Sequence, residues 1–242
     1  MTPDRAGPDG HNGAMASVPA GPAPAADPRP ALVARWVATV DAVRGPDAAG
    51  PAPEPYAENL LGRWDEPQRA YHTVAHLTAV LDRIDLLAAH SYAEDIELVR
   101  LAAWFHDAVY LPERDNNEER SARLAERALA ELGLDERRVA EVVRLVRLTL
   151  SHDPADADGN GAVLCDADLG VLAGSPEEYA AYASAVRTEY GFVEGETFRA
   201  VRAELLLQML ERPALFRTEY GHRHWEEQAR QNLRTELDLL VM

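Results

Sequence analysis

From about residue 30 to residue 240, apolar side chains recur every three or four positions, and this spacing constrains the fold more than any other feature of the chain. The period matches an α-helix, whereas a half-buried strand alternates every two residues. The segment A-L-V-A-R-W-V-A-T-V-D-A-V-R, which ends at Gly45 and Pro46, is typical. No alternating strand pattern and no internal repeat interrupts the series. The sequence therefore predicts an all-α bundle.

The helical pattern divides into segments of unequal length. We expect further helices near residues 74–90, 92–109, 117–133, 135–151, 167–173, 177–190, 195–212 and 223–240. The stretch D-P-A-D-A-D-G-N-G is a loop by composition, and we expect loops over residues 111–117 and 152–164 to shape any pocket. Residues 29–242 are predicted to form a single helical domain.

The first 28 residues differ in composition from the rest of the chain. They are mainly Pro, Ala, Gly and Asp, with few large apolar side chains. Such a segment buries too little surface to offset the entropy of ordering, so we expect a disordered tail over residues 1–28. The sequence does not distinguish Met1 from Met15 as the start of the protein.

Charge and residue usage exclude several classes of function. The formal net charge is −17, and all 24 basic residues are Arg. The acidic balance argues against general nucleic-acid binding, and the lack of Lys excludes P-loop, Schiff-base and Ser–Lys chemistry. The lone Cys165 excludes a disulfide framework and thiolate zinc clusters. With no long apolar run and no signal-peptide pattern, we expect a cytoplasmic protein without membrane contact.

A His–Asp pair, His106 and Asp107, lies inside one of the most apolar runs of the chain, L-A-A-W-F-H-D-A-V-Y. Burying a carboxylate is costly unless a positive group pairs with it. A solvated helix end would explain the pair structurally, whereas a bound cation would explain it functionally. Polar residues in other apolar stretches of the chain help to distinguish the solvated helix end from the bound cation.

Two other apolar helical stretches carry such residues. A-Y-H-T-V-A-H-L-T-A-V-L contains His72 and His76, four positions apart. Positions i and i+4 share a face where both are helical, and Thr73 is a candidate cap that would put His76 in the first turn of the helix. V-L-C-D-A-D-L-G-V-L contains Asp166 and Asp168. A surface histidine pair and an N-capping Asp166 are the structural explanations. Taken together, imidazoles and carboxylates within apolar stretches indicate a metal site instead.

The order H…HD…D resembles the signature of the HD superfamily of metal-dependent phosphohydrolases, in particular a bacterial group of small HD-domain proteins. Matching blocks cover about residues 30–240, and they read Y-H-T-V-A-H-L, A-A-W-F-H-D-A-V-Y, D-N-N-E-E-R-S-A, L-C-D-A-D-L-G-V-L and Y-A-S-A-V-R-T-E-Y. The resemblance implies an HD-domain helical bundle with additional C-terminal helices. It also implies a divalent metal ion (Mn, Zn, Mg, Fe, Co or Ni), with a second ion as an open alternative, bound by His76, His106, Asp107 and Asp168.

The resemblance further implies catalytic roles. Asp107 would bridge to the attacking water and accept its proton. Asp168 matches the last Asp of the family better than Asp166 does. Asp166 would instead hydrogen-bond to a metal ligand and orient it. The chain is also similar to the cyclic-nucleotide phosphodiesterases, in which the earlier His protonates the leaving alkoxide, and His72 occupies that place.

Other residues are candidates for contacts with water or substrate. Arg187 is our first choice for binding the phosphoryl group, followed by Arg69 and Arg120. Glu118 is expected in the first turn of a helix, either as a catalytic group that reaches toward bound water or as a favourable acidic first turn. His152 is predicted to bind substrate or a second metal, with a helix-terminal cation as the alternative.

The sequence therefore predicts a metal-dependent phosphohydrolase that acts on a small phosphorylated metabolite or nucleotide. An HD-type di-iron oxygenase is the alternative among enzymes, with Glu118 and His152 as extra ligands. A non-catalytic helical metal-binding module is the third reading. The substrate, the metal and the oligomeric state stay open.

Overall fold

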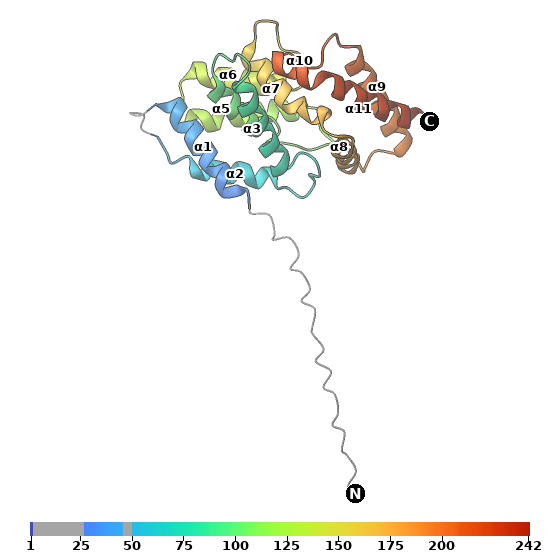
Figure 1. The fold of residues 1–242 in the computed structure, drawn as a ribbon. Helices are drawn as coiled ribbons and strands as arrows, with labels where there is room; N and C mark the ends of the chain where they lie inside the picture. The colour runs from blue at the N-terminus through green and yellow to red at the C-terminus, as the bar shows by residue number, and fades with distance from the viewer. Residues whose placement is uncertain (2–26, 46–49) are drawn as a thin grey trace.

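The structure, a computed structural model, describes Met1, residues 27–45 and residues 50–242. The predicted tail over residues 1–28 lies outside the described residues except for Met1, Asp27 and Pro28, as does Met15. Within the described part, the chain forms eleven α-helices and one 3-10 helix, without a strand, which confirms the predicted all-α fold (Figure 1). None of these helices combines the length with the apolar character that crossing a bilayer demands.

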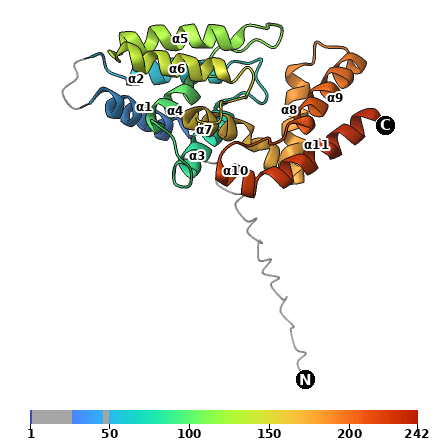
Figure 2. The same cartoon turned by 90° about the horizontal axis from the view of Figure 1, so that it is seen from above.

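The helices form two groups. Helices α1 to α7, which we call the bundle, span Arg29–Arg44, Glu54–Trp64, Val74–Ala88, Ile96–Phe105, Asn117–Glu131, Glu136–Leu148 and Gly159–Leu169. The 3-10 helix η1 (Gly170–Ala173) follows, and helices α8 to α11 span Pro176–Glu189, Gly195–Glu211, Glu219–His224 and Glu226–Val241. Helices α8, α9 and α11 lie together at one end of the molecule, and with η1 we call them the C-terminal lobe (Figure 1, Figure 2).

Helix α4 is the centre of the bundle. Seven of its ten residues are buried, and it packs against α1, α3, α5, α6 and α7. A helix that is apolar over most of its surface has to be largely surrounded by others. Asp95 caps its start by accepting hydrogen bonds from the N–H groups of Glu97 and Leu98. The helix ends at Phe105, earlier than predicted, so that the buried His106 is its C-cap and Asp107 follows the helix.

Helix α7 begins earlier than the sequence indicated. Residues predicted as the end of a loop form its first turns from Gly159, because Asp158 accepts a hydrogen bond from the Gly161 N–H and caps the helix. A Cβ at position 161 would lie 2.7 Å from Cδ2 of Leu148, so glycine permits close packing on α6. Burial of Val163 in this first part of the helix offsets the low helix propensity of glycine.

The C-terminal lobe has a core of its own. Its buried apolar side chains are Leu172, Tyr179, Leu206, Leu215, Phe216, Ala229 and Leu233. Arg202 of α9 forms a bidentate ion pair with Glu236 of α11, at 2.8 and 2.9 Å, and both side chains are largely buried. This pair fixes the register of the two helices because a guanidinium and a carboxylate meet in a defined plane.

Candidate metal centre

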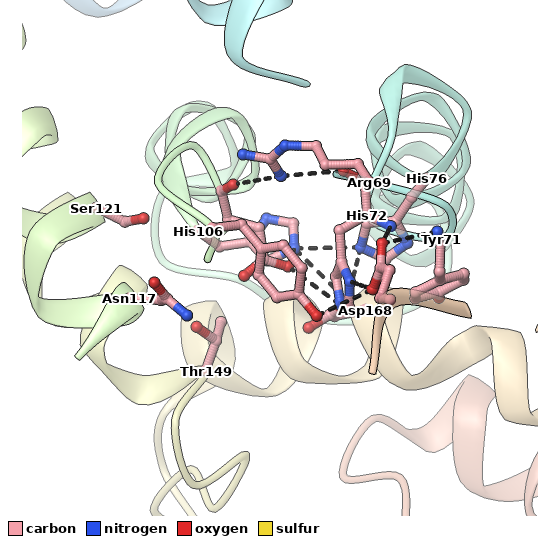
Figure 3. A network of polar contacts seen from close by, with 12 residues as sticks. Arg69, Tyr71, His72, His76, His106, Asn117, Ser121, Thr149 and Asp168 are labelled. Atoms are coloured by element: carbon pink, nitrogen blue, oxygen red, sulfur yellow. Dashed lines mark hydrogen bonds and ion pairs between the residues drawn. The ribbon is translucent and has the colours of Figure 1, made fainter. Parts of the chain in front are cut away.

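The four predicted metal ligands come from α3, from α7 and from the residues at the end of α4. Figure 3 shows three of them, His76, His106 and Asp168, close to one another. His76 lies in the first turn of α3, His106 caps α4, Asp107 follows directly, and Asp168 lies in the last turn of α7. Both histidines are buried, whereas the side chains of the two aspartates are each 14% exposed. The site therefore has a closed imidazole side and a carboxylate side that solvent reaches.

The donor atoms have the spacing of ligands around one ion. His76 Nε2 lies 3.2 Å from His106 Nε2 and 3.1 Å from Asp168 Oδ1, and the donor atoms of these three residues all lie within 4.8 Å of one another. Asp107 Oδ2 lies 3.2 Å from His106 Nε2. Two ligands about 2.1 Å from one ion are about 3.0 Å apart at a right angle and about 3.4 Å apart at the tetrahedral angle. The cluster of His76, His106 and Asp168 could therefore hold a metal ion, with Asp107 at its edge.

A backbone carbonyl fixes the His106 ring for this purpose. Nδ1 of His106 lies 2.8 Å from the Ala103 carbonyl oxygen, which can only accept a hydrogen bond. Nδ1 therefore carries the hydrogen, and in the neutral ring the lone pair is on Nε2, which faces the cluster. This is the tautomer that a metal-binding histidine requires.

The charges of the cluster call for a positive partner. Burial raises the pKa of Asp107 and of Asp168, but the neighbouring imidazoles, His106 first, outweigh it and lower both. Burial lowers the pKa of His106, yet the two carboxylates raise it well above its ordinary value. For His76 burial prevails over Asp168, and its pKa falls. Two ionised carboxylates in a nearly closed site are stabilised either by an imidazolium or by a divalent cation.

His72 lies beside the cluster. On the side away from Asp107, its ring contacts the carboxylate of Glu189, the last residue of α8. Its Nδ1 is 2.7 Å from Glu189 Oε2, and its Nε2 is 3.8 Å from Asp107 Oδ2. Burial lowers the pKa of His72, but Asp107 and Glu189 outweigh burial and raise it. His72 is thus oriented with one nitrogen toward the carboxylate side of the site.

Glu189 makes five hydrogen bonds, although its side chain is fully buried. Its Oε1 accepts from the N–H groups of Ala70, Tyr71 and His72 at 2.8–3.0 Å, and the Tyr110 hydroxyl donates to Oε2 at 2.9 Å. Burial raises the pKa of Glu189, but the bonds from His72 and the backbone lower it to about 2. A single carboxylate of the C-terminal lobe therefore anchors the whole turn that carries His72.

Sequence reasoning did not identify Glu189, although V-R-T-E-Y contains it, and selected Arg187 from the same block. The Arg187 guanidinium donates to the carbonyl oxygens of Tyr190 and Val193, at 2.6 and 3.1 Å, and lies over the Phe198 ring. These contacts close the turn after α8. Arg187 therefore has a structural role in this turn, and its part in substrate binding stays a prediction.

Arg69 also has a structural role in place of the predicted contact with substrate. Its side chain is fully buried, and it donates to the carbonyl oxygens of His72 and Asp107 at 3.0 and 2.9 Å. The guanidinium lies beside the rings of Trp64 and Tyr110. Arg69 therefore fastens together the two turns that carry His72 and Asp107.

His152 does reach the cluster. Its Nε2 lies 2.8 Å from Asp168 Oδ2, and its backbone has a φ of 47°, in the left-handed region that a non-glycine residue rarely adopts. Arg212, at the end of α9, donates to the carbonyl oxygens of Ser151 and His152 at 2.9 and 3.1 Å. The strained turn is held by these bonds, which place the ring against the carboxylate of Asp168.

The other candidates lie elsewhere. Glu118 is in the first turn of α5 and is half-buried, but within the described residues it forms no hydrogen bond or ion pair with the cluster. Arg120 is exposed and lines a cavity with Arg63 and Val109. Asp166 is fully buried and accepts hydrogen bonds from the backbone of residues 217 and 218, so it anchors the segment before α10 instead of orienting a ligand.

Comparison with protein-family models, with curated proteins and with solved structures finds no match to this chain.

Proposed function

We propose that this protein is a metal-dependent phosphohydrolase that acts on a small phosphate ester or nucleotide. The observation that carries the proposal is the convergence of His76, His106, Asp107 and Asp168, with neighbouring donor atoms 3.1–3.6 Å apart. Their order along the chain is the order of the HD superfamily, which the sequence resembles. Two imidazoles and two carboxylates suit zinc, manganese or iron.

A divalent metal in such a site lowers the pKa of a water molecule toward neutrality and provides hydroxide at ordinary pH. Asp107 lies on the solvent-accessible side, between His106 and His72. Its carboxylate would accept the proton of the attacking water. Asp168 would be held in position by His152, which occupies its second oxygen.

His72 would protonate the leaving oxygen. Glu189 holds Nδ1 of His72, so Nε2 is the nitrogen available on the side of Asp107. General acid catalysis by a positioned side chain contributes roughly 10²–10⁴-fold in rate. We assign no arginine to the phosphoryl group, because Arg69 and Arg187 both donate to backbone carbonyls.

Elemental analysis of the purified protein, followed by a screen of phosphorylated metabolites with the metal that it contains, tests the proposal. We expect about one divalent ion per chain for a mononuclear site, and release of inorganic phosphate or a nucleotide product from at least one compound. Asp168→Asn should lose both the metal and the activity. Asp156→Asn, whose side chain is 99% exposed, is the matched control and should keep both. A metal-free wild-type protein that hydrolyses the same compound equally well would contradict the assignment.

The role of His72 has its own test. His72→Ala should keep the metal but slow esters with poor leaving groups far more than those with good ones. Glu189→Gln should show the same selectivity at a smaller size, about 10–100-fold, because it acts through His72. Glu177→Gln, on the exposed surface of the same helix, should leave both rates unchanged. Equal losses on good and poor leaving groups would remove the general-acid role.

The di-iron oxygenase is a second candidate because Asp168 presents its two oxygens to different histidines. Oδ1 faces His76 and His106, and Oδ2 faces His152, as in a carboxylate that bridges two ions. Two iron ions per chain, and an absorbance change on adding dioxygen to the reduced protein, would favour this reading. One ion per chain and no reaction with dioxygen would favour the hydrolase.

A further inference from the structure

A groove runs between α2 and α5. It consists of three cavities of about 340, 430 and 480 Å³ that share walls. The middle cavity shares Arg63, Val109 and Arg120 with the smallest one, and shares Leu124 and Arg127 with the largest. The shared walls make it one continuous groove, which lies apart from the four predicted metal ligands.

The middle of the groove is positively charged. Its walls carry four arginines, Arg63, Arg120, Arg123 and Arg127, against one carboxylate, Glu126. Within the described residues, Arg120 and Arg127 form no ion pair. Arg123 pairs with Glu119 at 2.9 Å, whereas the guanidinium ions of Arg120 and Arg127 are left without a carboxylate partner among the described residues. In a chain of net charge −17, two such neighbouring guanidinium ions suit an anion.

The largest cavity has a different character. Tyr56, Leu60, Phe105 and Leu124 line it, and Arg127 marks its border with the arginine-rich part. The Tyr56 hydroxyl donates to Glu131 Oε2 at 3.2 Å, which connects the two helices at this end. An aromatic ring and an apolar wall suit a flat, weakly polar group, since a ring stacks on aromatic side chains.

We propose that the α2–α5 groove binds a nucleoside polyphosphate. The base would lie in the cavity of Tyr56, and the phosphates would lie among the arginines of the middle cavity. Apolar and cationic parts adjoin in one groove, and a ligand with one flat ring and several phosphates matches both. The proposal is independent of the hydrolase assignment.

The groove also touches the segment that carries the metal ligands. Phe105 lines the largest cavity and Val109 lines the other two, and these residues flank His106–Asp107. Ser121 of α5 connects the same segment to the arginine-bearing helix, because its hydroxyl accepts from the Val109 N–H at 3.0 Å. A nucleotide in the groove would therefore contact the residues on either side of His106–Asp107.

Isothermal titration with adenosine 5′-(β,γ-imido)triphosphate, in the presence of a chelator, tests the groove without hydrolysis. We expect binding to the wild-type protein, and at least tenfold weaker binding to the double variant Arg120→Gln/Arg127→Gln. Arg199→Gln/Arg234→Gln is the matched control, since it removes two exposed arginines of the lobe without ion pairs among the described residues. This control and His76→Ala should each bind within twofold of the wild type.

Three outcomes would overturn the proposal. Equal weakening in the two double variants would show attraction by net charge alone. Loss of binding in His76→Ala, with binding kept in Arg120→Gln/Arg127→Gln, would place the nucleotide at the metal centre. Absence of binding to the wild-type protein would remove the site. Tripolyphosphate should bind more weakly than the nucleotide and adenosine more weakly still, and equal affinity of tripolyphosphate would overturn the assignment of the base to the Tyr56 cavity.

Discussion

The bundle and the C-terminal lobe contribute to the candidate metal centre in different ways. All four predicted ligands are on α3, α7 or the end of α4, in the bundle. The lobe and the segment around α10 supply groups that hold the bundle residues in place. Glu189 holds His72, Arg212 holds the turn of His152, and the backbone around residue 217 binds Asp166.

The two regions also differ in the size of their cores. Within the described residues, thirty-five buried apolar side chains form one cluster in the bundle, whereas seven form the cluster of the lobe. The lobe also exposes large apolar side chains on α9, Val201 and Leu205 among them. We therefore expect the lobe to open locally at lower free energy than the bundle. The candidate donors therefore lie in the region with the larger core, and their orientation depends on the region with the smaller one.

The largest effect is expected from removing a donor in the bundle. His106→Ala should abolish metal binding and lower activity by more than the roughly 100-fold that the loss of a supporting residue costs. Metal content by mass spectrometry and initial rates on the substrate found in the screen measure this. His224→Ala, at an exposed histidine, is the control and should change neither. Normal metal content in His106→Ala would contradict the proposal that His106 of the bundle is a metal ligand.

The next effect concerns the stability of the lobe. Arg202→Ala leaves the largely buried Glu236 with the Tyr179 hydroxyl as a partner but without its positive charge partner, which should destabilise the lobe by about 3–5 kcal/mol. Amide hydrogen exchange should accelerate in α9 and α11 and stay slow in α4. Activity should fall as well, because Glu189 belongs to the lobe. Uniform acceleration of exchange through both regions would show that they unfold as one unit and would remove the distinction between them.

Glu189 gives a pH dependence to the contact between lobe and bundle. Its pKa is lowered from 4.5 to about 2, so the unfolded chain binds more protons between these values. Its contribution is complete above about pH 4.5 and is lost as the pH falls toward 2. It amounts to up to about 3 kcal/mol. Thermal unfolding from pH 6 to pH 3 should therefore show a smaller loss of Tm in Glu189→Gln than in the wild type, whereas parallel curves would contradict this role.

The smallest change in stability is expected from an exposed ion pair, and it serves as a reference for the buried one. Arg147 and Glu119 form an exposed ion pair on the bundle, at 2.7 Å, with side chains 49% and 40% exposed. Solvent screens such a pair, so Arg147→Ala should lower the free energy of unfolding far less than Arg202→Ala does. Urea unfolding of this variant beside Arg202→Ala compares an exposed with a buried ion pair. A loss as large as that of Arg202→Ala would contradict the role given to burial.

Much of the fold could be predicted from the sequence because helical periodicity is local. The helices near residues 117–133 and 177–190 are found close to the predicted bounds. The start of α7 was missed, because the glycines of G-N-G indicate a loop and only the tertiary packing on Leu148 favours a helix. The end of α4 was placed too late, because the apolar run continues beyond Phe105 although the helix does not.

By itself, the sequence determined the helical class and the residue types of the donor set, since apolar spacing and charges inside apolar runs can be read locally. The tertiary structure decided which groups support the donors. Glu189 and His72 are 117 positions apart, and no local pattern relates them. Asp166 and Asp168 are two positions apart, yet they face different partners. The reason is physical: the role of a charged side chain depends on what packs around it, and that is settled only when distant helices meet.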